Sequence, residues 1–282
     1  MTIEESLYKD IYDVIKKKKA GLHEPDFNKT DIKTVSECVK SSFVSTYGKF
    51  VTKFENSLKI FTKSKYVVAT NTGTSALHIA LKLVGVKNNT NVILPTLSFV
   101  ATGNAVIYNA AIPIFLDSSE KTFCLDEIKL EQFLINNTYV HKGKRYSKHN
   151  KKIISAIITT HVFGSTCNIE KVIKIGRKYS IPIVEDCAEG LGSYFKKKHL
   201  GTFGDVGVLS FNGNKIITSG SGGAIITNSK KKYFDALHLV SVSKIKHKWR
   251  FFHNKLGWNY RMSSLAASLG YSQLKRIKKL IL

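Results

Sequence analysis

Short apolar runs that alternate with helical patterns are the feature that most limits how this 282-residue chain can fold. Between several of the runs, apolar residues recur with helical spacing, as in the stretch from Ile169 to Ile175. Strands that alternate with helices form a mainly parallel sheet covered on both faces. The sequence therefore predicts an α/β domain with a mostly parallel, seven-stranded sheet, whose strands are expected at 66–69, 92–94, 112–116, 153–158, 181–184, 206–211 and 224–227.

Composition is that of a globular protein: 43% of the residues are hydrophobic, which is enough for a full core. The first residues lack the basic start and apolar centre of a signal peptide, and no apolar run approaches the roughly 18 residues of a membrane span. We therefore expect a cytoplasmic protein without membrane insertion. The cysteines lack metal-type spacing, so we expect reduced, buried thiols and no metal site at Cys38, Cys124, Cys167 and Cys187.

The formal net charge of +24 raises the question of a nucleic-acid partner. The basic residues form separate clusters, such as 16–19, 142–152 and 244–250, without interleaved aromatic residues that would stack on bases. A generally basic surface explains this better than a specific nucleic-acid site. Such a surface attracts polyanionic small molecules, among them nucleotide diphosphates.

Lys215 is the strongest candidate for covalent chemistry, because it precedes the glycine-rich run 220–223. A lysine amine attacks carbonyl groups when it is unprotonated. Gly73 and Thr74 lie where a strand passes into a helix, and a helix N-terminus favours phosphate. The competing interpretations are that Lys215 is a surface residue and that Gly73 and Thr74 form a tight turn with Thr74 as helix cap. Ser210 either ends a strand or donates a hydrogen bond to the same phosphate.

Polar and aromatic side chains follow three of the expected strands. Asp186 ends a buried strand, where it either pairs with a protonated ring nitrogen or caps the next helix. Glu189 either reaches the same ligand or is solvated, and Phe99 either stacks on a flat ring or joins the core. His161 either forms a hydrogen bond near a ligand or, as we expect, satisfies a turn carbonyl. Asn259, beside Arg261, suits an anionic ligand or lies on the surface.

Together these segments resemble the DegT/DnrJ/EryC1/StrS family of pyridoxal phosphate-dependent sugar aminotransferases. The resemblance runs through nearly the whole chain. The matching segments are 43–48, 71–77, 95–104, 161–164, 185–189, 201–205, 210–223 and 257–262.

The resemblance implies a type I fold, pyridoxal 5'-phosphate as cofactor and a role for each position. Lys215 matches the Schiff-base lysine, which also moves a proton between cofactor and sugar. Asp186 matches the acid on the pyridine nitrogen, Glu189 a residue near the phenolic oxygen, and Phe99 the ring-stacking residue. The phosphate cradle falls on Gly73, Thr74 and Ser210. Asn259 matches an asparagine that reaches the neighbouring subunit's phosphate, which implies a homodimer with shared sites.

The segment from Ser210 to Thr218, with His23, Glu24 and Pro25, is similar to the branch that aminates UDP-linked 4-keto-6-deoxy-N-acetylhexosamines for legionaminic acid, bacillosamine and related surface glycans. The implied activity is transfer of an amino group from an amino acid, glutamate by expectation, to such a sugar. Glu189 stands where many relatives have glutamine or histidine, Ser221 interrupts a run that is often all glycine, and Cys187 replaces a usual alanine.

Two domains are expected: residues 1–235 as the cofactor-binding large domain with an N-terminal helical segment, and 236–282 as the start of a small, incomplete C-terminal domain. Two other functions remain open. The sugar dehydratases of the same fold carry histidine at the Schiff-base position, where this chain has Lys215. A catalytically inactive relative that acts as a basic nucleic-acid or scaffold protein is suggested by the charge.

Overall fold

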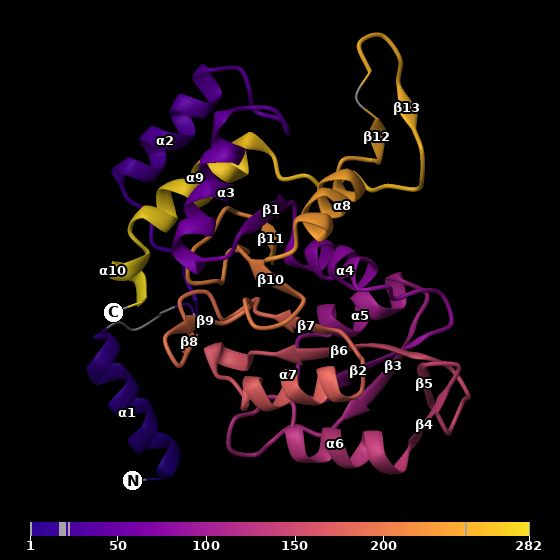
Figure 1. Cartoon of the computed structure of the whole chain (residues 1–282). Helices are drawn as coiled ribbons and strands as arrows, with labels where there is room; N and C mark the ends of the chain where they lie inside the picture. Colours follow the sequence, from indigo (N-terminus) through magenta and orange to yellow (C-terminus); the bar gives the residue numbers. More distant parts are fainter. Residues whose placement is uncertain (1, 17–20, 22, 246, 282) are drawn as a thin grey trace.

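A seven-stranded sheet forms the centre of this computed structural model, which describes residues 2–16, 21, 23–245 and 247–281 (Figure 1). The strand order is β1-β11-β10-β7-β6-β2-β3, and within this sheet only β11 runs antiparallel to its neighbours. The predicted mostly parallel sheet is confirmed, with small shifts at the strand ends. Its strands are β1 (Tyr66–Thr70), β2 (Asn91–Pro95), β3 (Ile112–Leu116), β6 (Ile154–Thr160), β7 (Ile183–Asp186), β10 (Val206–Ser210) and β11 (Gly223–Thr227).

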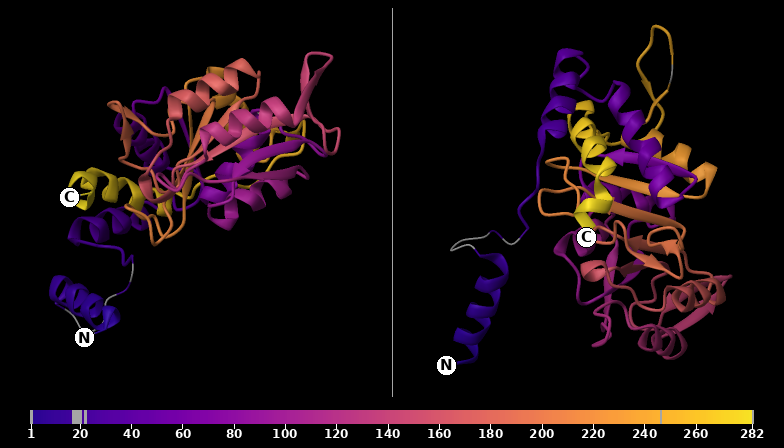
Figure 2. Two further views of the ribbon diagram at one scale, coloured as in Figure 1. Left: turned by 90° about the horizontal axis from the view of Figure 1, so that it is seen from below. Right: turned by 90° about the vertical axis from the view of Figure 1, so that its left-hand side faces the viewer.

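Helices cover both faces of the sheet (Figures 1 and 2). Successive strand side chains point to opposite faces, so Val68 packs with one helical layer and Val67 with the other. The first layer consists of α4 (Gly73–Leu83), α5 (Val100–Tyr108) and α8 (Lys230–Val240). The second layer has α3 (Lys49–Thr62) and α9 (Ser264–Lys275) over one end, and α6 (Glu127–Asn136) and α7 (Ile169–Lys178) over the other.

Smaller elements surround this core. Helix α2 (Lys29–Lys40) begins at the capping box of Asn28 and Asp31 and packs on α9, whereas α1 (Ile3–Ile15) buries none of its side chains. All four cysteines are free and buried, as predicted. The remaining elements are η1 (Val162–Gly164), α10 (Ile277–Ile281) and the hairpins β4 (Thr138–His141) with β5 (Lys144–Ser147), β8 (Tyr194–Phe195) with β9 (Lys198–His199), and β12 (Lys244–Ile245) with β13 (Phe252–His253).

The polar composition of 136–152 predicts an exposed loop, whereas the structure has the β4–β5 hairpin in this stretch. Tyr139 and Tyr146 face each other across the two strands with their ring centroids 5.6 Å apart, which stabilises the pair. Lys142 and Gly143 both have positive φ, as a two-residue hairpin turn requires. The polar composition of this stretch concealed the alternation of its aromatic residues.

The division into domains 1–235 and 236–282 stays a prediction. Helix α8 crosses position 235, and its buried Ala236 and Val240 belong to the core of the sheet. Helix α9 packs on α3 and α2, which joins the last described elements to the N-terminal helices. The candidate site lies at the carboxyl ends of the parallel strands, where α4 and α5 begin.

Candidate active site

A cavity of about 480 Å³ lies at the carboxyl ends of the parallel strands. Its wall is built from the segments that follow β1, β2, β6, β7 and β10, which is where open α/β sheets bind ligands. Seven of the eight residues expected to hold the cofactor line this one cavity: Gly73, Thr74, Phe99, Asp186, Glu189, Ser210 and Lys215.

Lys215 lies in the loop after β10, and its side chain is only 16% exposed. Its Nζ lies 3.2 Å from Oε1 of Glu189. The other oxygen of Glu189 accepts a hydrogen bond of 2.8 Å from the backbone N–H of Phe163, so the carboxylate is held from both sides. The amine therefore faces the cavity next to a fixed negative charge, and the interpretation of Lys215 as a freely solvated surface residue is wrong.

Asp186 ends β7 and is 3% exposed. Burial raises the pKa of its carboxyl, although the hydrogen bonds that it accepts from Thr102 and from the backbone of Ala188 act in the opposite direction. The Thr102 Oγ1 to Asp186 Oδ2 distance is 2.6 Å. A buried carboxyl whose charge is poorly compensated fits a cationic partner in the cavity. No helix follows Asp186 directly, so its alternative role as a helix cap is wrong.

The start of α4 lines another part of the cavity. This part is rich in backbone N–H groups. Thr72, not Thr74, is the N-cap, and its Oγ1 accepts the N–H of Ser75. The N–H groups in the first turn of a helix lack intrahelical partners, and the helix dipole favours an anion there. A Cβ on Gly73 would lie 2.9 Å from the Cβ of Ser210 and would fill the space between them. These residues thus fit a phosphate group.

Phe99 is the N-cap residue of α5 and is 75% exposed. It lines the cavity, which rules out the alternative that it belongs to the core. An aromatic ring at the cavity wall suits a flat ligand.

His161, which also lines the cavity, forms a buried pair with Glu185 that was not predicted from the sequence. His161 Nε2 lies 3.0 Å from Glu185 Oε2, and the pair is fully buried. Burial by itself raises the pKa of Glu185, but the hydrogen bond with His161 and those from the backbone of residues 201–204 bring it below its ordinary value. His161 therefore bonds a carboxylate and not the turn carbonyl that we expected. Two adjacent acids on a buried strand point to opposite faces, which was the available signal.

Asn259 is the predicted residue that does not join the others. It is exposed and pairs with Ser241 in an isolated antiparallel bridge. It lines a different cavity, of about 1110 Å³, together with Tyr47 and Arg261. Arg261 is held by a bidentate pair with Glu55, at 2.6 and 3.2 Å.

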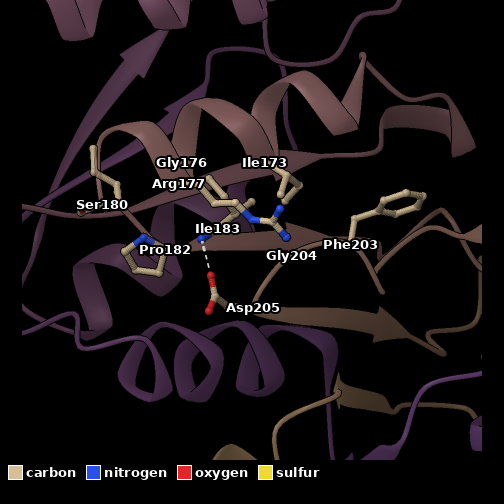
Figure 3. A pocket seen from close by; sticks show the side chains of 10 residues that line it. Ile173, Gly176, Arg177, Ser180, Pro182, Ile183, Phe203, Gly204 and Asp205 are labelled. Atoms are coloured by element: carbon tan, nitrogen blue, oxygen red, sulfur yellow. Dashed lines mark hydrogen bonds between the residues drawn. The ribbon is translucent and has the colours of Figure 1, made fainter.

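One further hollow contains none of the predicted site residues. This hollow of about 370 Å³ beside α7 is lined by Arg177, Ile183 and Asp205, and the Asp205 carboxylate there accepts a hydrogen bond of 3.0 Å from the Ile183 N–H (Figure 3).

Among the described residues, no cluster of histidine, cysteine or acidic side chains is arranged to hold a metal ion. Within the same part of the chain, none of the helices has the length and apolar character needed to cross a membrane.

The fold and this cavity define a class of protein: the α/β fold is the type I fold of pyridoxal phosphate-dependent aminotransferases. Solved structures support this class. An aminotransferase of Helicobacter pylori, PseC, involved in the biosynthesis of pseudoaminic acid, superposes with a TM-score of 0.83 at 27% identity over 93% of this chain and 67% of that one. The profile of the DegT/DnrJ/EryC1/StrS aminotransferase family matches residues 25–282. The chain belongs to this family, as the sequence predicted.

Curated relatives include nucleotide-sugar enzymes. A GDP-perosamine synthase of Escherichia coli O157:H7 is 34% identical over 255 residues, 90% of this chain and 65% of the relative. A UDP-4-amino-4,6-dideoxy-N-acetyl-beta-L-altrosamine transaminase of Campylobacter jejuni is 31% identical over 253 residues, 89% of this chain and 63% of the relative. The chain spans less than two thirds of the length of these relatives.

Proposed function

We propose that the chain carries the active site of a pyridoxal phosphate-dependent sugar aminotransferase. The observation that carries the proposal is the meeting of Lys215, Asp186 and the N-terminus of α4 in one cavity. These three groups fit the aldehyde, the ring nitrogen and the phosphate of the cofactor, in that order. When bound, pyridoxal 5'-phosphate supplies an electron-withdrawing ring that stabilises negative charge on the adjacent carbon.

Each residue then has a task that its surroundings support. Asp186 keeps the ring nitrogen protonated, because a carboxylate in a desolvated position stabilises an adjacent cation. Gly73, Thr74 and Ser210 hold the phosphate, and Phe99 orients the ring. Glu189 contacts the lysine and would also contact the group beside the aldehyde when the cofactor is bound.

Lys215 would hold the cofactor through its amine, and the free amine would serve as the base and acid that moves the proton on the reacting carbon. Its amine lies at the edge of the cavity next to Glu189, and the mostly buried position excludes bulk water.

The substrates that we propose are L-glutamate as amino donor and a UDP-linked 4-keto-6-deoxy sugar as acceptor, for surface polysaccharide or nonulosonic acid biosynthesis in the cytoplasm. The sugar-nucleotide transaminases among the relatives and the motif from Ser210 to Thr218 support this class. The +24 charge favours the approach of nucleotide anions. We further propose a homodimer in which Asn259 contacts the phosphate in the neighbouring site.

The sugar dehydratase alternative is disfavoured by the lysine at position 215. The basic binding protein is disfavoured by the buried Asp186 in the cavity, since a poorly compensated buried acid has no role in binding polyanions.

The test is the visible absorption spectrum of the purified chain after addition of pyridoxal phosphate, compared with Lys215→Ala. We expect a band that appears only with the lysine and that shifts when L-glutamate is added. Identical spectra of the two proteins, without a shift on adding glutamate, would contradict the proposal. Retention on DNA that needs no cofactor and disappears with salt would support the binding protein instead.

A further inference from the structure

A second chamber, of about 450 Å³, adjoins the active-site cavity at Lys215. The two spaces share Phe163, Glu189, Asn214 and Lys215, so a molecule in the second chamber lies directly beside the reactive amine. Its outer wall is the segment 23–26, to which the proposed function assigns no role.

Contacts with α9 and its C-cap hold this wall in place. The Asp26 carboxylate pairs with Arg276. The backbone carbonyl oxygen of Asp26 accepts a hydrogen bond of 2.9 Å from the Gln273 side chain. Just beyond, Asn28 caps α2. The segment therefore stays next to Lys215 although its side chains are exposed.

The chamber is acidic, whereas the chain as a whole has a net charge of +24. Its ionisable side chains, apart from the imidazole of His23, are three carboxylates and a single ammonium group: Glu24, Asp26, Glu189 and Lys215. Two of the carboxylates have cationic partners, since Asp26 pairs with Arg276 and Glu189 with Lys215. Among the described residues, the Glu24 carboxylate accepts only the N–H of Gly21, at 3.2 Å, and keeps most of its acceptor capacity.

This arrangement excludes the anionic parts of the substrates. A phosphate or an α-carboxylate in the chamber would face the Glu24 carboxylate. Among the described residues that line the chamber, the ammonium group of Lys215 is already paired with Glu189, so binding an anion there costs free energy. A ligand with hydroxyl and amide N–H groups instead finds a charged acceptor in Glu24 and a polar side chain in Asn214. The exposed ring of Phe163 and the side chain of Ile216 offer apolar surface for C–H groups.

We infer that this chamber binds the uncharged pyranose ring of the acceptor sugar, with Glu24 accepting hydrogen bonds from ring hydroxyl or acetamido N–H groups. The inference rests on the proposed function and adds a specificity-determining residue to it. The nucleotide of the acceptor then lies outside the chamber.

The test uses saturation-transfer NMR on the cofactor-loaded full chain, with methyl N-acetyl-glucosaminide as an uncharged probe and UDP as an anionic one. The proteins are wild type, Glu24→Gln and the control Glu120→Gln, whose exposed carboxylate lines neither chamber. We expect the sugar probe to bind wild type and Glu120→Gln equally, and Glu24→Gln about tenfold more weakly, equivalent to about 1.4 kcal/mol. UDP affinity should be the same in all three proteins.

Equal sugar affinity in wild type and Glu24→Gln, or no sugar binding to the wild type, would overturn the inference. A gain in affinity for L-glutamate in Glu24→Gln would likewise overturn it, because the chamber would then be the donor's. The spectral response of the wild type to pyridoxal phosphate and glutamate separates the two proposals. If that response is intact, a negative sugar result rejects only the chamber assignment, whereas its absence rejects the proposed function.

Discussion

Lys215 Nζ lies 3.2 Å from Oε1 of Glu189, and the other oxygen of Glu189 is fixed by the backbone N–H of Phe163. This places a negative charge beside the nitrogen that is to link chain and cofactor. An opposite charge at this distance favours the protonated form of that linkage. A glutamine at position 189 would keep the hydrogen bond from Phe163 and lose the charge.

Replacing Glu189 with glutamine is therefore expected to move the pH midpoint of the visible absorption change to lower pH, by about one pH unit. The measurement is a spectrophotometric pH titration of the cofactor-loaded protein. Glu170→Gln is the matched control, because Glu170 pairs with Lys196 on the surface. Equal midpoints in all three proteins would show that Glu189 does not act on the linkage.

Asp186→Asn is expected to abolish amino transfer while stabilising the cofactor-free protein at neutral pH. Burial raises the pKa of Asp186, so the protonated form stabilises the fold at low pH, and this contribution is lost as pH rises through the folded-state pKa. Asparagine cannot ionise. Its thermal midpoint should exceed that of the wild type by a few degrees at pH 7 to 8, and the gap should narrow as pH falls through the folded-state pKa of Asp186. A gap that widens on acidification would contradict this account.

Gly73→Ala is expected to weaken cofactor binding, because the added Cβ would lie 2.9 Å from the Cβ of Ser210 in the phosphate cradle. We expect at least a tenfold higher dissociation constant for pyridoxal phosphate, about 1.4 kcal/mol. Fluorescence quenching titrations measure it. Gly85→Ala is not a suitable control, because Gly85 has a positive φ that strains other residues. Gly103 lies inside α5, and a Cβ added there would lie 3.8 Å from the Phe115 ring, an ordinary van der Waals distance. Gly103→Ala should therefore leave cofactor affinity unchanged.

The sheet and most of the cavity could be predicted because both follow from local patterns. Apolar runs of strand length gave the strands, and parallel strands bring their carboxyl ends together, so residues as far apart as Gly73 and Lys215 meet. Partners that depend on side-chain direction were not predictable. Thr102 reaches Asp186 from another element, and Glu185 bonds backbone N–H groups of a turn sixteen to nineteen residues away. Neither contact leaves a periodic signal.

Glu185→Gln is expected to destabilise the chain by about 3 kcal/mol, because it leaves several buried N–H groups without a charged acceptor. The pKa of Glu185 is below its ordinary value, so its contribution is present at neutral pH and is lost as pH falls through the folded-state pKa. Urea unfolding at pH 7 measures the loss. The difference between wild type and variant should shrink in acid, and a loss of stability that is independent of pH would point to packing instead.

Mixing two defective variants tests whether the sites are shared between subunits. Lys215→Ala lacks the reactive amine, and Asn259→Ala is expected to bind cofactor weakly if Asn259 serves the neighbouring phosphate. In a mixed dimer, one site then carries both defects and the other carries neither. When equal amounts are exchanged, about a quarter of the sites should regain the visible band at limiting cofactor, since half of randomly paired dimers are mixed. If Asn259 acts within its own subunit, every site keeps a defect and no band returns, which would reject the shared site.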